Sequence, residues 1–317
     1  MRTIRVVAVV TAVLVYVLIV LGAVVRTTNS GLSCPDWPTC YGHWLPLPSD
    51  IAALPTVGYA YWQVMLEWVH RLIAGFFVGP LVLLLAILTF LRRRERPRIA
   101  LTGGLLLVLL LVQGALGGLT VLDQNSPWSV AIHLGNALLV MTATLRIASL
   151  ASRSSGASAR VLFGPVLLAW CLALLAMMSA AMTAKSGASL ACATWPLCNG
   201  KVVPDLGDEF IRIHFLHRVL AAATAITLLY LYGRSRGRPD LSPSLQRLAA
   251  MAAGLVVVQV GLGALVILLE APIWKAVLHQ AVGVLTFTVV TVILWRCAPA
   301  GNAPALGEPD GLALRGT

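Results

Sequence analysis

Charged side chains are scarce in this chain. Only 11% of its 317 residues are charged and 12 are acidic, whereas 59% are hydrophobic. The mean hydropathy of +0.88 excludes a water-soluble globular protein. Apolar runs of about 20 residues, enough to cross a bilayer, recur along the sequence. These runs lack the polar–apolar alternation of a membrane β-barrel, so the sequence predicts an all-α integral membrane protein.

Eight transmembrane helices are predicted from the apolar runs. They lie at about 5–25, 64–91, 99–121, 129–150, 161–183, 211–232, 248–270 and 275–296. The first run lacks a small-residue cleavage site followed by a soluble domain, so we expect it to be retained in the mature protein. No transit peptide rich in arginine and serine precedes it. This favours the bacterial plasma membrane as the location of a multi-pass protein.

Basic residues outnumber acidic residues, and the formal net charge is +11. The arginines cluster in alternate loops, around residues 2–5, 92–98, 153–160 and 234–238. By the positive-inside rule these loops face the cytoplasm, which predicts an N-in, C-in topology. This topology explains the excess of positive charge, so membrane lipid is the expected surrounding and no nucleic acid partner is expected.

Short motifs recur in the second half of the chain at a nearly constant separation. They are the Cys-x5-Cys loops Cys34–Cys40 and Cys192–Cys198, the pairs His70-Arg71 and His217-Arg218, and the single histidines His133 and His279. Such repetition indicates two copies of one unit. Each copy has an even number of spans, so both insert the same way up and are related by an axis along the membrane normal.

The predicted organisation is therefore two pseudo-repeated four-helix bundles. The first comprises residues 1–151 and the second residues 161–297. Residues 152–160 form a cytoplasmic linker, and residues 298–317, rich in proline, glycine and alanine, form a disordered cytoplasmic tail. The long loops at 27–62 and 185–210 both lie outside, where each can cover its own bundle.

Four of the six cysteines fall in the two external loops. Because the external side is oxidising, the disulfides Cys34–Cys40 and Cys192–Cys198 are plausible. A Trp-Pro pair inside each loop favours a compact turn. The remaining cysteines, Cys171 and Cys297, are expected to be packing residues.

Four histidines lie at matched places near the outer ends of spans. His70 and His133 are in the second and fourth spans, and His217 and His279 are in the sixth and eighth. A single intramembrane histidine is as often a hydrogen-bonded packing residue as a ligand. Two facing histidines at one depth in a four-helix bundle suit a metal ion or a heme iron.

Heme is the predicted ligand because a bare zinc ion would need two more ligands in each half. The first half offers only Glu67 nearby, and the second offers only His214. A heme iron has just two axial positions to fill. Bis-histidine heme ligation is therefore preferred, with zinc binding or simple packing as the alternatives.

Cations near these histidines could meet the heme propionates. Arg71 and Arg218 directly follow two of the histidines, and Lys275 lies four residues before His279 on the same helical face. The alternative is that all three cations reach to the membrane interface for solvation.

The two halves differ one turn before the first histidine of each pair. Glu67 shares a helical face with His70, whereas His214 stands at the matching place before His217. An intramembrane carboxylate costs on the order of 2.5 kcal/mol or more, which suggests that it is functional. Glu67 could move protons, making the first half reactive while the second holds a fixed electron-transfer heme. It could instead be a partner of Arg71 or of a histidine N–H.

These residues together resemble the heme A synthases of bacteria and mitochondria. The resemblance covers nearly the whole chain except the cytoplasmic tail. It rests on the eight spans in two halves and on these motifs: Glu67-Trp-Val-His70-Arg71, His133, His217-Arg218, His279 and both cysteine pairs. The cysteine pairs are similar to those of the bacterial form, which has two loop disulfides.

The resemblance implies an oxidoreductase that converts the C8 methyl group of heme O to a formyl group, giving heme A for terminal oxidases. Two successive hydroxylations, with water as the implied oxygen source, would produce a gem-diol that loses water. Heme O synthase would be the substrate donor and oxidase assembly factors the recipients. The electron acceptor is not specified, and the chain could form a homo-oligomer.

The resemblance also implies a role for each half. His217 and His279 would carry heme b, and His70 and His133 would receive the substrate heme. Glu67 matches the carboxylate that is essential in that family. The Cys34–Cys40 loop borders the active half, where we expect a structural role in preference to a role in receiving heme.

Two other functions fit parts of the pattern. A diheme b-type electron-transfer protein would need the four histidines but not the difference between Glu67 and His214. A membrane thiol-disulfide oxidoreductase would need the loop cysteines but not the histidines, and its reactive cysteines are usually closer together. A transporter is disfavoured because few other charges lie within the spans.

Overall fold

The computed structural model describes residues 1–52, 58–152, 157–270 and 273–299. Within these ranges the regular secondary structure is helical. The strand-like pairing there consists of two isolated β-bridges. Eight helical stretches in the described chain are long and apolar enough to cross a membrane, which confirms the all-α fold class. Their bounds are Arg2–Thr27, Tyr61–Phe90, Pro97–Leu122, Pro127–Leu150, Ala159–Lys185, Glu209–Ser235, Pro243–Leu268 and Ile273–Cys297.

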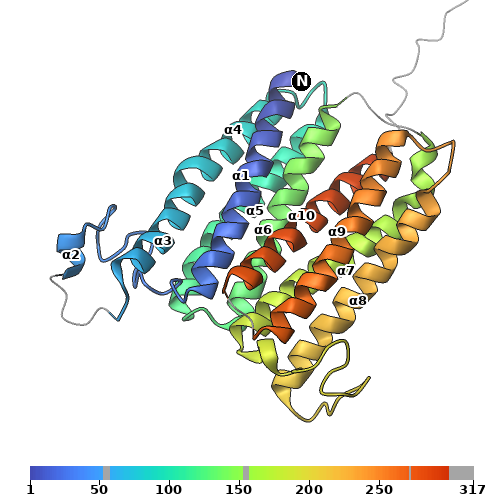
Figure 1. Ribbon diagram of the computed structural model, residues 1–317. Coiled ribbons are helices and arrows are strands. Elements are labelled where there is room, and N and C mark those ends of the chain that lie inside the picture. Colours follow the sequence, from blue (N-terminus) through green and yellow to red (C-terminus); the bar gives the residue numbers. More distant parts are fainter. Residues whose placement is uncertain (53–57, 153–156, 271–272, 300–317) are drawn as a thin grey trace, which may run out of the picture.

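In the described chain these stretches are built from nine α-helices of twelve residues or more, labelled in Figure 1, together with the short segments η1 and η2. In the first half the spans are α1 (Arg2–Thr27), α3 (Tyr61–Leu72) with η1 (Ile73–Val78) and α4 (Gly79–Phe90), α5 (Pro97–Leu122) and α6 (Pro127–Leu150). In the second half they are α7 (Phe163–Lys185), α8 (Glu209–Ser235), α9 (Pro243–Leu268) and α10 (Ile273–Cys297). The short elements are α2 (Pro48–Ala52), η2 (Ala157–Leu162) and η3 (Ala188–Leu190).

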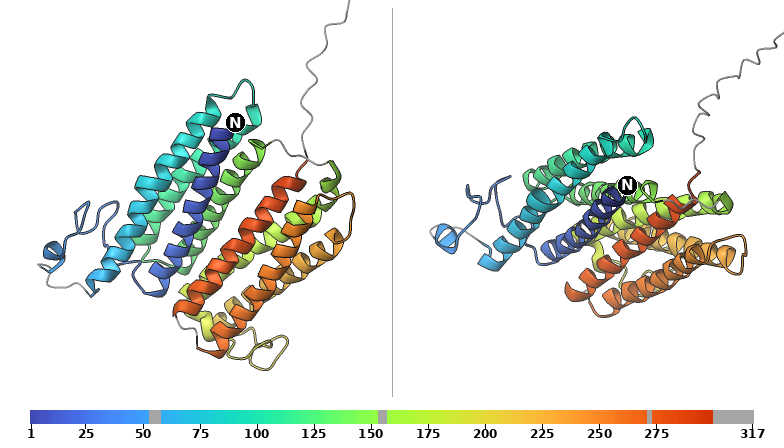
Figure 2. Two further views of the ribbon diagram at one scale, coloured as in Figure 1. Left: turned by 45° about the horizontal axis from the view of Figure 1, so that its top comes forward. Right: turned by 90° about the horizontal axis from the view of Figure 1, so that it is seen from above.

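The spans form two rings of four helices that lie side by side (Figure 2). Helices α1, α4, α5 and α6 each contact their two neighbours in the first ring, and α7, α8, α9 and α10 do the same in the second. At the seam between the rings, α6 contacts α7 and α10, and α1 contacts α10. This arrangement agrees with two four-helix units; their origin as a repeat and the boundaries 1–151 and 161–297 stay predictions.

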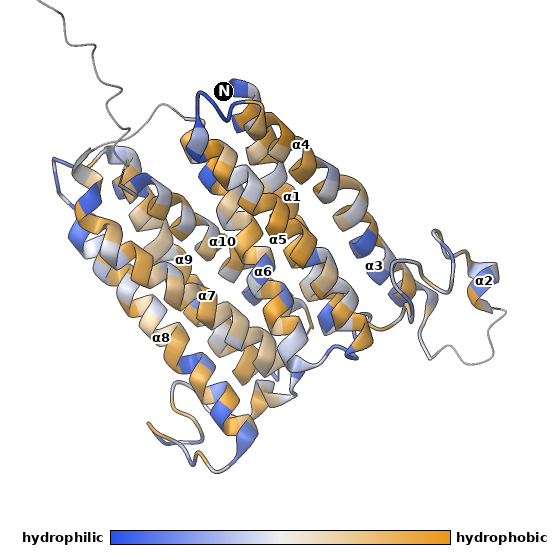
Figure 3. Ribbon diagram, turned by 180° about the vertical axis from the view of Figure 1, so that it is seen from behind, coloured by the Kyte–Doolittle hydropathy of each residue, from blue (hydrophilic) through white to orange (hydrophobic). Residues whose placement is uncertain are grey.

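The two ends of the bundle differ in character. The N-terminus and the arginine-rich turn after α4 lie at one end, which we call the basic end, and both cysteine loops lie at the other, the loop end (Figure 1). Hydrophilic residues gather at both ends and apolar residues cover the length between them (Figure 3). The N-in, C-in orientation stays a prediction, and the expected tail disorder concerns residues 300–317, which lie outside the described residues.

The second span contains a π-helical segment, η1, that the sequence analysis did not predict. Pro80 has no N–H, and its ring would collide with a carbonyl of the preceding turn in a regular α-helix. The chain widens instead, because the Gly79 N–H bonds to the carbonyl of Ala74, five residues earlier. This widened segment begins about one turn after His70, whereas α8, which carries His217, is α-helical throughout.

The lone cysteines differ in environment. Cys297 is buried among apolar residues of the second ring, as expected of a packing residue. Cys171 is exposed on α7, so it does not pack in the interior of the chain and that expectation was wrong. Its position is compatible with contact to lipid, because exposed apolar side chains cover the outer faces of the spans.

Candidate functional site

Both predicted disulfides form at the loop end. Cys34 bonds to Cys40 with a Cα–Cα separation of 4.7 Å, and Cys192 bonds to Cys198 with one of 4.6 Å. All four cysteines are buried. Each loop contains a cis Trp-Pro bond and closes with a β-bridge just after its second cysteine. The two loops therefore have the same local architecture.

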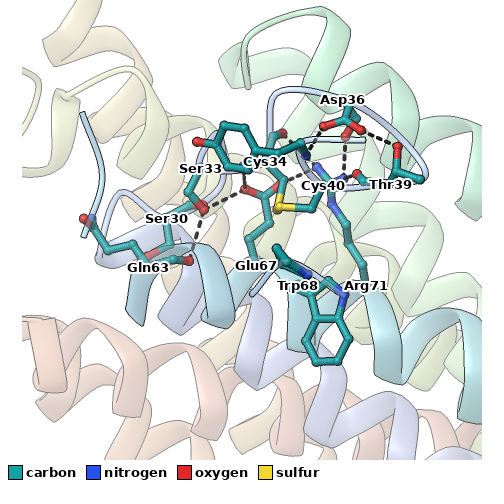
Figure 4. Close-up of a disulfide and its surroundings, with 12 residues drawn as sticks. Ser30, Ser33, Cys34, Asp36, Thr39, Cys40, Gln63, Glu67, Trp68 and Arg71 are labelled. Atoms are coloured by element: carbon teal, nitrogen blue, oxygen red, sulfur yellow. Dashed lines mark hydrogen bonds and ion pairs between the residues drawn. A yellow bond between two sulfur atoms is a disulfide. The ribbon is translucent and has the colours of Figure 1, made fainter. Parts of the chain in front are cut away.

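Glu67 on α3 anchors the first loop (Figure 4). Its side chain is buried, and the carboxylate accepts hydrogen bonds from the Cys34 N–H at 2.9 Å and the Ser33 hydroxyl at 3.1 Å. It also forms an ion pair with Arg71 at 2.6 Å, one turn further along the helix. The Glu67 carboxylate, which the sequence analysis placed beside the ligand His70, therefore has three partners within the protein, and two of them belong to the disulfide loop.

Arg71 and Arg218 both bind the carbonyl groups of their own loops. Arg71 donates to the carbonyls of Asp36, Thr39 and Cys34 at 2.5, 2.7 and 3.1 Å. Arg218 likewise donates to three loop carbonyls, those of Cys192, Thr194 and Leu197, at 2.7, 2.8 and 3.1 Å. Most donors of the two guanidiniums are therefore used within the protein, which leaves little capacity for the predicted contact with propionates.

His214 takes the place of Glu67 in the second half. Its Nδ1 accepts the Cys192 N–H at 3.2 Å, and the Arg218 Nε lies 3.2 Å from its Nε2. Ala191 stands where the first loop has Ser33. The second half therefore lacks both the carboxylate of Glu67 and the hydroxyl group that donates a hydrogen bond to it. The two halves share one anchoring scheme but differ in its charge.

Asp36 adds a second negative group to the first loop only. Its carboxylate accepts from the Thr39 hydroxyl and from the N–H groups of Tyr41 and Gly42. Partial burial alone would raise the pKa of Asp36, but these hydrogen bonds stabilise the charged form and hold its pKa below the ordinary value. In the second loop a hydroxyl, Thr194, accepts the matching N–H of Gly200.

His217 on α8 is fixed through one ring nitrogen. Its Nδ1 lies 3.1 Å from the Ala176 carbonyl oxygen and 3.2 Å from the Ser179 hydroxyl, both on α7. A metal-binding histidine is typically oriented in this way, with the other nitrogen left for the metal. The geometry thus suits coordination through Nε2.

His279 on α10 interacts electrostatically with His217, and its role as the second ligand of this pair stays a prediction. The ring is packed against Gly263, where an added Cβ would lie 3.2 Å from its Cε1 atom. The Gln259 amide nitrogen is 3.4 Å from its Nε2. The close approach of the ring to α9 explains why a glycine is needed at this position.

His70 and His133 are also brought within electrostatic range of one another. The Gln113 amide nitrogen lies 3.1 Å from Nε2 of His133, and its oxygen accepts from Asn136 at 2.7 Å. His70 has a different neighbour, Gly22 on α1, where a Cβ would lie 3.2 Å from its Cε1. No hydroxyl at this position holds the His70 ring as Ser179 holds that of His217.

Unsatisfied polar atoms mark both histidine pairs. Among the described residues, the buried side-chain nitrogen and oxygen atoms without a hydrogen-bond partner are His70 Nδ1, His279 Nδ1 and Gln259 Oε1. Buried polar atoms are normally paired, so the protein alone leaves neither histidine pair fully satisfied. The described chain contains no group of three His, Cys, Asp or Glu side chains suited to a bare metal ion. A heme, which needs two axial ligands, fits this donor set.

Sequence reasoning missed several residues around the histidines. Gln113 and Gln259 begin a run that repeats in the two halves, so this repeat could have identified them. Gly22 and Ser179 differ in residue type and carry no motif, and only the packing of α1 and α7 shows that both face a histidine. Lys275, a predicted propionate contact, lies over the ring of Trp274 at 4.9 Å.

Comparison with known proteins now identifies the family. Residues 5–291 match COX15-CtaA, described as cytochrome oxidase assembly protein. The chain belongs to the COX15-CtaA family. The match covers six spans completely, most of the first and last spans, and both cysteine loops, and the family assignment agrees with the resemblance seen in the sequence.

Individual members of the COX15-CtaA family match along most of their length. A protein of Shewanella oneidensis is 30% identical, over 90% of this chain and 95% of its own. One of Shouchella clausii is 29% identical, over 89% and 93% of the two chains, and one of Geobacillus kaustophilus is 26% identical, over 93% of each. All three carry the name heme A synthase.

Proposed function

We propose that this chain is a heme A synthase, which oxidises the C8 methyl group of heme O to the formyl group of heme A. The observation that carries this proposal is the match to heme A synthases along almost the entire chain. The two histidine pairs support it, because each offers two imidazoles for the axial positions of a heme iron and no described group of three ligands suits a bare metal ion.

The second half is the proposed site of a resident heme b, held by His217 and His279. The Ala176 carbonyl and the Ser179 hydroxyl orient His217, as expected of a permanent ligand. When bound there, heme b supplies a one-electron redox centre. The hydrogen bond to Nδ1 also increases the electron donation of the imidazole.

The first half is the proposed substrate site, where His70 and His133 receive heme O. Gly22 leaves His70 Nδ1 without a partner, so this ring is less firmly held than that of His217, its counterpart in the repeat, although His279 of the second half also lacks a partner at Nδ1. A loosely held ligand suits a molecule that must enter, react and leave. The η1 segment, one turn from His70, adds a local departure from regular helix of the kind often found at functional sites.

The proposed reaction requires the protein to remove protons and electrons from the substrate. Conversion of a methyl group to a formyl group with the oxygen of one water releases four protons and four electrons per molecule. Glu67 is the proposed proton acceptor, and Ser33, the Cys34 N–H and Arg71 hold its carboxylate in place. Because a heme b in the second half could hold one electron at a time, an acceptor outside the chain must finally take up the four electrons.

The setting of the reaction follows from the same proposal. The protein would lie in a bacterial plasma membrane with its loop end and heme sites at the outer face. A heme O synthase would deliver the substrate, and factors that assemble terminal oxidases would receive the product. The family description, cytochrome oxidase assembly protein, supports this place in oxidase biogenesis.

The decisive test is co-expression of the full chain with a heme O synthase, followed by chromatography of the extracted hemes. A synthase yields heme A together with heme b. A diheme b-type carrier yields only unmodified heme b, about two equivalents per chain, and this result would refute the proposal. Glu67→Gln serves as the control, with heme b retained and heme A lost.

A further inference from the structure

Two cations, one from each ring, lie at the loop end near the seam between the rings. Arg26 is in the last turn of α1 and Lys185 is in the last turn of α7, so both lie at the loop end. They are close enough to interact electrostatically. Arg26 also lies within range of His279, although it belongs to the other half of the chain.

The side chain of Arg26 forms a hydrogen bond across this seam. Its Nη2 donates to the Gln280 side-chain oxygen at 2.8 Å, and Gln280 directly follows His279 on α10. On the same side of α1, the Tyr16 hydroxyl donates to the Ala281 carbonyl at 3.2 Å. The guanidinium is thus positioned beside the second histidine pair by two contacts between α1 and α10.

No carboxylate neutralises either cation within the described part of the chain. The ion pairs there use Arg71, Arg92, Arg238 and His43, and none involves Arg26 or Lys185. Arg26 has five N–H donors, and the Gln280 amide oxygen takes one of them. This contrasts with Arg71 and Arg218, whose donors are used on loop carbonyls.

Such an arrangement is unfavourable without an anion. Two like charges repel, and a partly buried guanidinium in a membrane-spanning helix has lost part of its hydration. A cation in the last helical turn can serve its own helix dipole, but that role does not require Arg26 to reach across to α10. A carboxylate between the two side chains would offset both costs through charge-assisted hydrogen bonds.

We propose that Arg26, with Lys185, binds a propionate of the heme held by His217 and His279. This inference rests on the proposed function, because it requires a porphyrin in the second half. It also replaces Arg218 and Lys275 as the main propionate contacts at that site. The first half would then contribute one side chain to the heme site of the second.

The test uses porphyrins with and without free propionates. Full-length protein in the His70→Ala background, which removes the first site, is produced under heme limitation and titrated in detergent with hemin and with hemin dimethyl ester. Soret absorbance reports binding. With Arg26 and Lys185 intact, the ester should bind about tenfold more weakly, the effect of losing a charge-assisted hydrogen bond. With Arg26→Gln and Lys185→Gln, hemin and ester should bind equally.

Two further variants separate charge from structure. Arg26→Lys keeps the charge and should keep most of the discrimination. Lys201→Gln removes an exposed lysine of the second loop and should leave discrimination unchanged. Persistence of discrimination in the double glutamine variant would overturn the inference, and so would its absence when the cations are intact. If the double variant instead loses co-purified phosphatidylglycerol and still discriminates, the cations hold a lipid phosphate and the inference is wrong. Failure of the protein to take up hemin at all would count against the proposed function itself.

Discussion

Glu67 and His214 anchor their disulfide loops in the same way, although one is a carboxylate and the other an imidazole. Each accepts the N–H of the first cysteine of its loop, and each contacts the arginine of the next turn. Because an imidazole without negative charge anchors the second loop, anchoring alone does not require the charge of Glu67. The charge is costly to bury, and the proposed proton transfer gives a reason for it.

Exchange of the two anchoring schemes tests this reasoning. The double variant Glu67→His, Ser33→Ala gives the first loop the residues of the second. We expect an intact disulfide and retained heme b, but conversion of heme O lowered by a factor of about 100 or more, the usual contribution of a general base. Co-expression and heme extraction provide the measurement. Full conversion by this variant would show that Glu67 only holds the loop.

At this scale the sequence predicted which residues lie together but not what each contacts. The histidines and Glu67 were found because they repeat, or fail to repeat, at matched positions. The use of Arg71 and Arg218 on loop carbonyls could not be predicted, because carbonyl groups leave no trace in a sequence motif. Arg26 was missed for a related reason: its neighbours come from a helix about 250 residues away along the chain.

The helices themselves were predicted closely, because apolar runs bounded by charged turns define them almost completely. The predicted and observed spans differ by only a few residues at each end. The exception is η1, where Pro80 changes the hydrogen-bond spacing within an apolar run. Hydropathy does not distinguish α from π spacing, so this local change needed the structure.

Each disulfide loop is fastened to its own helix, which makes the two loops independent elements. Arg71→Lys removes the planar fork that binds the first loop, and Arg218→Lys does the same for the second. We expect each variant to increase protease cleavage in its own loop about tenfold, from the loss of charge-assisted hydrogen bonds. Mass spectrometry of limited digests would measure this, with the other loop as internal control. Equal cleavage of both loops in either variant would contradict their independence.

Across the whole molecule, the separation of basic end and loop end predicts how the protein lies in the membrane. Val202 is exposed in the second loop, and Arg94 lies in the arginine-rich turn. In intact cells a membrane-impermeant maleimide should label Val202→Cys but not Arg94→Cys, and both should react after lysis. The opposite labelling pattern would reverse the predicted N-in, C-in topology.

The contact of α1 with α10 has a consequence for the ancestry of the protein. If the two rings arose by duplication of one gene, the ancestral product had four helices and paired with a second copy of itself. The seam between the rings was then a subunit interface, and a cation from one subunit reached toward the heme of its neighbour. On this view the fused chain preserves a cofactor site shared between protomers, and the separated halves would have to reassociate before the second could hold its heme fully.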